Sequence, residues 1–300
     1  MKKFISQGGF LKNLSPSIDA NMLFMPGFSY AVGIILCPHV SFVDANDSIT
    51  FQGARAHSFN NKFKTTLPPN ASQVMRIAQE VAALTTSLPL DVESAIFVRT
   101  DDAKCTLLRA LIIGPEGTPY SGGCFQFDIM FPFTYPKVPP LVRFYTKAYG
   151  LFRFNPNLYS CGNVCLSLLG TWPGPESEQW HKDTSTLLQS LIFVAEPYFN
   201  EPGFEKSIGT TEGAKLSQAY NENVLLRTVQ YAMVEQLRCP SSGFEDVVYT
   251  HFALKKDRIL EFWVGKCKIL LSIHMGLPTR LGHVETWQIT SLVLHMGCTL

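Results

Sequence analysis

The chain has 300 residues, of which 46% are hydrophobic and 16% charged, and its formal net charge is +1. A charge so near zero excludes a general electrostatic attraction to nucleic acid or to an anionic membrane, so we expect neither as a partner. The length suits one sizeable domain with extensions, or two small domains.

Residues 1–66 show no steady periodicity, and MKKFISQGGF at the start lacks the apolar core and cleavage site of a signal peptide. Met22–Val43 is apolar and nearly long enough to span a bilayer, but Pro26, Pro38 and His39 interrupt it. We favour a buried or poorly ordered extension over a membrane span. The first 66 residues are left as an unassigned extension, either disordered or an artefact of the gene model.

An N-terminal helix and a four-stranded antiparallel meander are predicted next, because helical spacing gives way to short apolar runs separated by turns. Asn70 or Ser72 can cap the helix, whose apolar face is expected to be Val74, Ile77, Ala78, Val81 and Leu84. The third strand alternates apolar and polar residues, which predicts that it is half-buried. The four expected strands are residues 95–100, 105–114, 124–131 and 141–145.

The second part of the chain is predicted to be helical. An apolar stripe indicates a short helix over Thr184–Glu196, which Pro197 ends. A long amphipathic helix is expected over Glu212–Leu237, and one more over residues 244–263. From about residue 265 the tail has no clear pattern, so residues 265–300 stay unassigned and the fold class is α+β.

Eight cysteines are scattered along the chain without a CxxC pair, which favours a reducing, intracellular compartment over a secreted disulfide framework. We expect the cytoplasm, with the nucleus as the alternative. Cys161 and Cys165 are four residues apart in NPNLYSCGNVCLSLLGTW and have no second close pair, so we expect no metal and no cofactor.

By local chemistry alone, Cys165 is either a loop nucleophile or, as is commoner for a free cysteine, a small buried apolar residue. Asn157 lies eight residues earlier and could donate a hydrogen bond to a developing oxyanion. A cysteine hydrolase would need a histidine base, and only His181 is near in sequence. Its polar EQWHKD surroundings favour an exposed surface residue instead.

Four segments in one order carry a more specific resemblance. GTPYSGG, FPFTYPKVPPLVRF, NPN followed by GNVCLSLL, and QWHKDTS resemble the motifs of the ubiquitin-conjugating enzymes over roughly residues 70–262. The finer pattern resembles the giant members of that family that carry a baculoviral IAP repeat and restrain apoptosis, in which asparagine also replaces the histidine of the tripeptide, as Asn155 does here.

The resemblance implies a UBC-like fold over residues 67–264 and a transferase without a cofactor. Cys165 would accept ubiquitin as a thioester from the ubiquitin-activating enzyme and pass it to a lysine of a protein substrate. Asn157 would stabilise the oxyanion or brace the loop, and Glu201, before Pro202, would be an acidic gate that positions the lysine.

Two departures from the family pattern bear on activity. The expected second helix, Thr184–Glu196, is about six residues, nearly two turns, shorter than in relatives, either by a natural deletion or by a mis-spliced gene model. A catalytically impaired module that binds through the same fold is therefore the alternative function. Lys137 stands where many members have an aromatic residue that docks ligase domains, so we expect ordinary docking of that kind to be weak.

Overall fold

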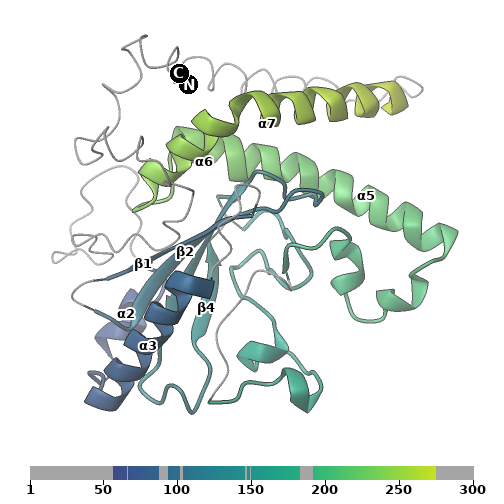
Figure 1. Cartoon of the computed structure of the whole chain (residues 1–300). Helices are drawn as coiled ribbons and strands as arrows, with labels where there is room; N and C mark the ends of the chain where they lie inside the picture. Colours follow the sequence, from purple (N-terminus) through teal and green to yellow (C-terminus); the bar gives the residue numbers. More distant parts are fainter. Residues whose placement is uncertain are drawn as a thin grey trace, which may run out of the picture.

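The computed structural model describes residues 57–65, 67–87, 94–101, 104–145, 147–148, 150–182 and 192–274. Within these residues a central sheet is surrounded by helices (Figure 1). Short 3-10 helices punctuate the loops between the sheet and the C-terminal helices. The elements are α2 (Asn60–Lys64), α3 (Ala71–Ser87), β1 (Ile96–Thr100), β2 (Leu107–Ile113), β3 (Cys124–Met130), β4 (Leu141–Tyr145), η3 (Ser167–Leu169), η4 (Glu176–Glu178), η5 (Pro197–Asn200), η6 (Phe204–Ser207), α5 (Thr211–Arg227), η7 (Thr228–Val234), α6 (Glu235–Arg238) and α7 (Glu245–His274).

The sheet is an antiparallel meander in the order β1-β2-β3-β4, which confirms the predicted topology. The glycine-rich turn between β2 and β3 closes on itself: Gly114 N–H donates to the Gly123 carbonyl at 2.8 Å, and Gly122 N–H donates to the Gly114 carbonyl at 3.0 Å. A turn of this kind joins adjacent antiparallel strands directly. The turn therefore sets the β2–β3 pairing.

Helix α3 begins where the sequence predicted, because the Asn70 side chain accepts a hydrogen bond from Gln73 N–H at 2.9 Å. The expected buried face was wrong in part. Ile77 is buried, but Val74 and Ala78 are exposed. The polar residues Gln73 and Glu80 are buried in their place, since Gln73 donates to the Pro132 carbonyl and Glu80 accepts from the Tyr135 hydroxyl.

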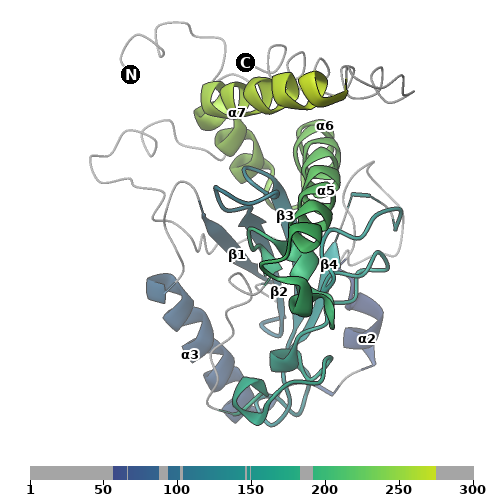
Figure 2. The same ribbon diagram turned by 90° about the vertical axis from the view of Figure 1, so that its right-hand side faces the viewer.

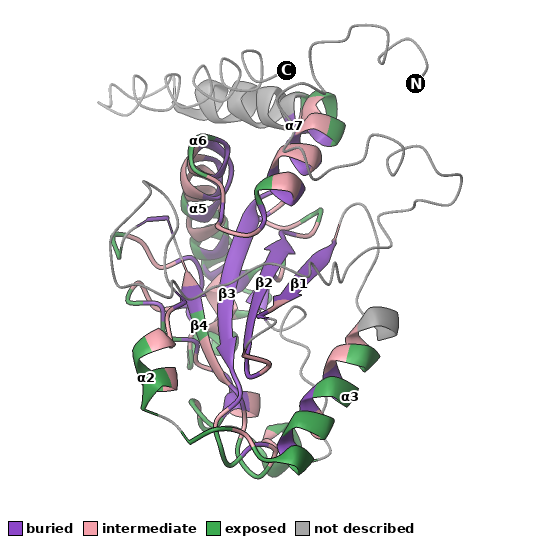
Figure 3. Ribbon diagram, turned by 90° about the vertical axis from the view of Figure 1, so that its left-hand side faces the viewer, coloured by how far each residue is buried: buried purple, intermediate pink, exposed green. Residues whose placement is uncertain are grey.

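The prediction that strand β3 is half-buried was wrong, because all seven of its residues are buried, as Figure 3 shows. One face meets the main apolar cluster. On the other face, Asp128 pairs with Arg109 at 2.8 Å, and α2 and the C-terminal helices lie over the two ends. Helices α2 and α3 accordingly lie on opposite sides of the sheet (Figure 2).

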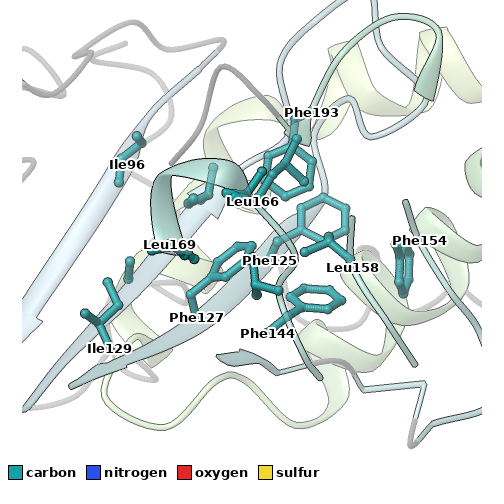
Figure 4. Packing of buried hydrophobic residues seen from close by; sticks show 14 of the residues in the cluster. Ile96, Phe125, Phe127, Ile129, Phe144, Phe154, Leu158, Leu166, Leu169 and Phe193 are labelled. Atoms are coloured by element: carbon teal, nitrogen blue, oxygen red, sulfur yellow. The ribbon is translucent and has the colours of Figure 1, made fainter. Parts of the chain in front are cut away.

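The main apolar cluster joins the sheet to the long loop that follows it. Phe125 and Phe127 of β3 contact Phe193, with ring centroids 4.7 and 6.2 Å apart (Figure 4). Leu166 and Leu169, on the loop after Cys165, are buried in the same cluster. Burying such side chains stabilises the fold by roughly 1.5–3 kcal/mol each. The segment that carries Cys165 is thus anchored to the core by the residues that directly follow the cysteine.

Residues 57–65 are packed, so ordered structure begins before residue 67, where we expected it to begin. The buried His57 ring contacts the Leu108 carbonyl through Nε2 at 2.9 Å. Ser58 donates to Asp128 Oδ2 through both its backbone N–H and its hydroxyl, each at 2.7 Å. This segment therefore covers part of the sheet, while the domain boundaries themselves stay a prediction.

The long C-terminal helix is confirmed, with one departure. Its first turn is capped by Thr210, whose hydroxyl accepts from Gly213 N–H, and its middle, Thr228–Val234, is π-helical. The following helix, α7, continues past the expected residue 263 to His274. Arg99 of β1 donates to both carboxylate oxygens of Asp246 at 2.7 and 2.8 Å, which fixes the start of α7 against the sheet.

Most of the expected second helix, Thr184–Glu196, lies outside the described residues. Its last four residues, 193–196, are not helical, and Pro197 opens the 3-10 helix η5 instead of following a helix. Met22–Val43 and residues 275–300 also lie outside the described part. Within the described part, no helix is both long enough and apolar enough to cross a membrane.

Candidate active site

The loop that carries both neighbouring cysteines folds back on itself. Isolated bridges join Asn155 to Leu158 and Leu158 to Val164. Between them Gly162 has a φ of 92°, and a Cβ there would lie 2.7 Å from the Phe144 carbonyl oxygen. Only glycine fits this turn without strain. The turn leaves Cys161 exposed and Cys165 half-buried.

Two predicted site residues, Asn157 and Cys165, are brought together by two hydrogen bonds. Cys165 N–H donates to the Asn157 carbonyl at 2.9 Å, and the Asn157 side-chain Nδ2 donates to the Cys165 carbonyl at 2.8 Å. The Asn157 amide, which was expected to donate to an oxyanion, therefore donates to the backbone carbonyl of Cys165 in this structure. This geometry is that of a brace for the loop.

Thr171 holds the chain on both sides of Cys165, and no sequence pattern had singled it out. Its hydroxyl donates to the Val164 carbonyl at 2.8 Å and accepts from Leu166 N–H at 3.0 Å. A hydroxyl suits this place because it can donate and accept at once. Thr171 therefore limits the freedom of the cysteine backbone.

Asn155, the first residue of the tripeptide, is fully buried and has partners on both ends of its amide. Nδ2 donates to the Ile192 carbonyl at 2.7 Å and to the Tyr120 hydroxyl at 3.1 Å, and Oδ1 accepts from Asn157 N–H at 2.8 Å. The Tyr120 hydroxyl in turn donates to the Phe154 carbonyl, and burial raises the pKa of Tyr120 well above its ordinary value. Asn155 is thus the centre of a polar network under the loop.

Glu201, the expected acidic gate, follows η5 and is paired with Arg153. Its Oε2 lies 3.4 Å from Arg153 Nη1, and both side chains are 36% exposed. Arg153 also donates to the Pro156 carbonyl and stacks over the Tyr159 ring, 4.3 Å from its centroid. Burial raises the pKa of Tyr220 to about 12, with Arg153 opposing the rise and Glu201 adding to it. The Arg153 guanidinium therefore joins the loop that contains Glu201 to the loop that contains Cys165.

Trp180 and His181, which both lie in the QWHKDTS motif, have structural partners. Trp180 Nε1 donates to the Pro136 carbonyl at 2.8 Å, and its ring lies 5.8 Å from that of Tyr135. His181 is exposed, with Nε2 3.3 Å from the Glu176 carbonyl. Among the described residues, no three histidine, cysteine or acidic side chains gather closely enough to hold a metal ion.

Comparison with known protein families gives a match that contains this loop. Residues 76–228, just over half of the 300-residue chain, match the family described as ubiquitin-conjugating enzyme. The match includes the sheet, the loop with Cys165 and the whole of α5.

Curated relatives agree with this match. The chain is 48% identical over 205 residues to the human protein named Dual E2 ubiquitin-conjugating enzyme/E3 ubiquitin-protein ligase BIRC6, which covers 65% of this chain and 4% of the relative. It is 44% identical over 199 residues to Probable ubiquitin-conjugating enzyme protein 17 of Caenorhabditis elegans, covering 65% of this chain and 27% of the relative. It is 45% identical over 202 residues to Probable ubiquitin-conjugating enzyme E2 25 of Arabidopsis thaliana, covering 65% and 32%.

The chain thus spans a small part of each of these three relatives, between 4% and 32% of their length. The matches confirm the resemblance read from the four sequence motifs and the α+β UBC fold that it implied. This chain belongs to the ubiquitin-conjugating enzyme family.

Proposed function

We propose that this chain is a ubiquitin-conjugating transferase and that Cys165 is its nucleophile. The Cys165 thiolate attacks the thioester that links ubiquitin to the activating enzyme, the activating enzyme's thiol leaves, and ubiquitin becomes bound to Cys165. A lysine amine of a protein substrate then attacks the same carbonyl carbon, an isopeptide bond forms and the Cys165 thiol is released. The lysine attacks as the neutral amine, and the proton that its nitrogen then loses passes to the departing Cys165 thiolate.

The observation that carries the proposal is the family match over residues 76–228, together with the two-bond brace between Asn157 and Cys165. In this mechanism Asn157 keeps the cysteine loop in shape, and its amide would have to leave the Cys165 carbonyl to donate to the oxyanion once the carbonyl carbon becomes tetrahedral. Glu201 orients the incoming lysine after it exchanges its contact with Arg153 for one with the ammonium group. An exposed pair of this kind is worth about 0–1 kcal/mol, so the exchange costs little.

The partners in this proposal are ubiquitin, its activating enzyme and protein substrates, and the chemistry needs no cofactor because ATP is consumed by the activating enzyme. We place the reaction in the cytoplasm, where cysteines stay reduced. A role in restraining apoptosis rests on the resemblance to the giant family members. The alternative, an impaired binding module, rests on the short second helix, and nothing in the comparisons favours it.

One assay tests the proposal. The chain is incubated with ubiquitin, activating enzyme and ATP, and the products are separated without reducing agent. We expect an adduct that a thiol reductant removes, that persists in Cys161→Ala, and that is absent in Cys165→Ala. Cys165→Ser should give an adduct that resists the reductant, because an oxygen ester replaces the thioester.

Three outcomes contradict the proposal. A folded wild-type chain that forms no adduct favours the binding module. An adduct that survives Cys165→Ala moves the chemistry to Cys161. Hydrolysis of ubiquitin esters that is lost in His181→Ala indicates a cysteine hydrolase.

A further inference from the structure

Asn200, the last residue of η5, reaches back to the loop that holds Cys165. Its Nδ2 lies 3.1 Å from Asn157 Oδ1 and 3.5 Å from Asn155 Oδ1. These contacts join residues 43 and 45 positions apart in the sequence. Asn200 therefore contacts two residues of the tripeptide.

The contact with Asn157 decides which way the Asn157 amide points. An asparagine amide has a donor end and an acceptor end, and a half-turn about its last bond exchanges them. Because Asn200 offers a donor, Asn157 turns its oxygen toward Asn200. Its Nδ2 is then directed at the Cys165 carbonyl, 2.8 Å away.

The neighbouring network keeps Asn200 in the same orientation. Asn155 donates from Nδ2 to the Ile192 carbonyl and the Tyr120 hydroxyl, so its oxygen must face Asn157 N–H and Asn200. A donor at Asn200 suits both oxygens. The next residue, Glu201, is tied to Arg153, which in turn donates to the Pro156 carbonyl, so a second tether joins the same two segments.

We propose that Asn200 is a positioning residue for the transfer of ubiquitin to lysine. It orients the Asn157 amide so that its donor end faces the backbone carbonyl of Cys165, which keeps the cysteine loop in shape, and it holds the Glu201 loop beside the cysteine loop. The inference rests on the proposed function and adds to it a residue to which the sequence analysis assigned no role.

The test compares Asn200→Ala with Asn200→Asp in single-turnover discharge of the Cys165 thioester to free lysine. Alanine removes the donor, and we expect the discharge rate to fall about tenfold, which corresponds to about 1.4 kcal/mol in the barrier. Aspartate has almost the shape of asparagine but only accepts hydrogen bonds. It should attract Asn157 Nδ2 away from Cys165, so its discharge should be slower than that of the alanine variant.

This order separates orientation from packing, because a residue that only fills space would tolerate aspartate better than alanine. A double-mutant cycle gives a second readout. In an Asn157→Ala background, Asn200→Ala should change the rate by less than about twofold, because Asn200 acts through Asn157. Asn223→Ala is the matched control, since Asn223 is exposed and donates to the Ala219 carbonyl at 3.0 Å; it should discharge at the wild-type rate.

A measurement on the uncharged protein keeps the inference independent of the proposed function. By NMR, the Asn157 side-chain amide protons should show contacts to the backbone at residues 165 and 166 in the wild type and lose them in Asn200→Asp. Unchanged contacts overturn the inference even in a chain that the activating enzyme does not charge. If both Asn200 variants form the thioester normally and discharge it at the wild-type rate, the inference is overturned while the proposed function stands. The same holds if the losses of discharge rate in the two single variants multiply in the double mutant.

Discussion

At the scale of single residues, Asn155 shows how a substitution within a family motif can keep the loop in place. It has no exposed surface, and its amide donates twice and accepts from Asn157 N–H. A buried amide so fully used fixes one arrangement of its neighbours, because any rotation leaves several polar groups unpaired. The cysteine loop owes its shape to this buried side chain as much as to the residues near Cys165.

We therefore expect Asn155→Ala to lower the free energy of unfolding by about 2–4 kcal/mol, because it leaves the Ile192 carbonyl and Asn157 N–H without this partner in a buried site. Urea unfolding followed by circular dichroism measures the change. Asn157→Ala, at a half-buried position, is the comparison and should cost less. Equal stability of Asn155→Ala and the wild type would show that the network adjusts or that water replaces the amide.

The motifs that resemble the family allowed part of the site to be predicted. Local chemistry left Cys165 open between a nucleophile and an inert buried residue, and the resemblance to the family motifs made Cys165 and Asn157 site residues; the structure does join them. Asn200 and Thr171 were missed because both lie in loops that fold back against the cysteine turn. No periodic pattern in the sequence indicates which loop residues make such contacts. The pairing of Glu201 with Arg153 was missed for the same reason.

At the scale of elements, the π-helical segment Thr228–Val234 lies very close to the glycine turn before β3. A Cβ on Gly123 would meet Thr228 Cγ2 at 2.8 Å, Phe125 Cε2 at 2.9 Å and Ala232 Cβ at 3.0 Å. The sequence predicted the long helix because Val229 and Met233 keep an apolar spacing, but that spacing does not distinguish an α-helical turn from a wider one. The close approach of helix and turn is a tertiary feature.

Gly123→Ala should therefore destabilise the protein by about 1–3 kcal/mol, since the added methyl group overpacks this contact. Thermal unfolding measures the effect. Adding Thr228→Ser to Gly123→Ala removes one of the three obstructing carbons and should restore part of the loss. If the single variant melts with the wild type, the helix shifts easily away from the turn and this contact does not hold it.

At the scale of the whole molecule, the face of the sheet that points away from the main apolar cluster carries a polar layer in its middle and apolar clusters at its two ends. Asp128 lies between Arg109 and the His57–Ser58 segment; burial alone would raise its pKa, but Arg109, His57 and the Ser58 hydrogen bonds together lower it. The alternation of apolar and polar residues in β3 predicted that one face of the strand is exposed to solvent. That prediction was wrong because a sequence pattern cannot show which distant segment covers a polar residue. The strand positions were predictable from turns and apolar runs, whereas the cover was not.

His251 makes the whole fold sensitive to mild acid. It is buried, its Nε2 donates to the Gly122 carbonyl at 2.9 Å, and burial lowers its pKa to about 4, with Lys255 adding to the shift. As the pH falls below 6.5, His251 becomes protonated in the unfolded chain, whereas in the folded chain it stays neutral until the pH approaches 4. The free energy of unfolding therefore decreases as the pH drops through this window. His57, whose pKa burial also lowers, acts in the same direction.

Between pH 7 and pH 5 this histidine should cost about 2 kcal/mol of stability. His251→Gln keeps a donor for the Gly122 carbonyl but cannot titrate, so its loss over the same range should be smaller by about that amount. Urea unfolding at the two pH values measures both. Parallel losses in the two proteins would show that His251 is protonated at little cost when folded.

The covered sheet also governs how this protein can be recognised. Every residue of β2 and β3 is buried, and among the described strand residues only Arg143 of β4 is exposed. A partner that approaches the described part of the chain consequently meets helices and loops instead of an open strand surface. Selectivity for partners can then change through substitutions on α3, α6 and α7 while the buried strands beneath the cysteine loop stay the same, so recognition and chemistry can evolve separately.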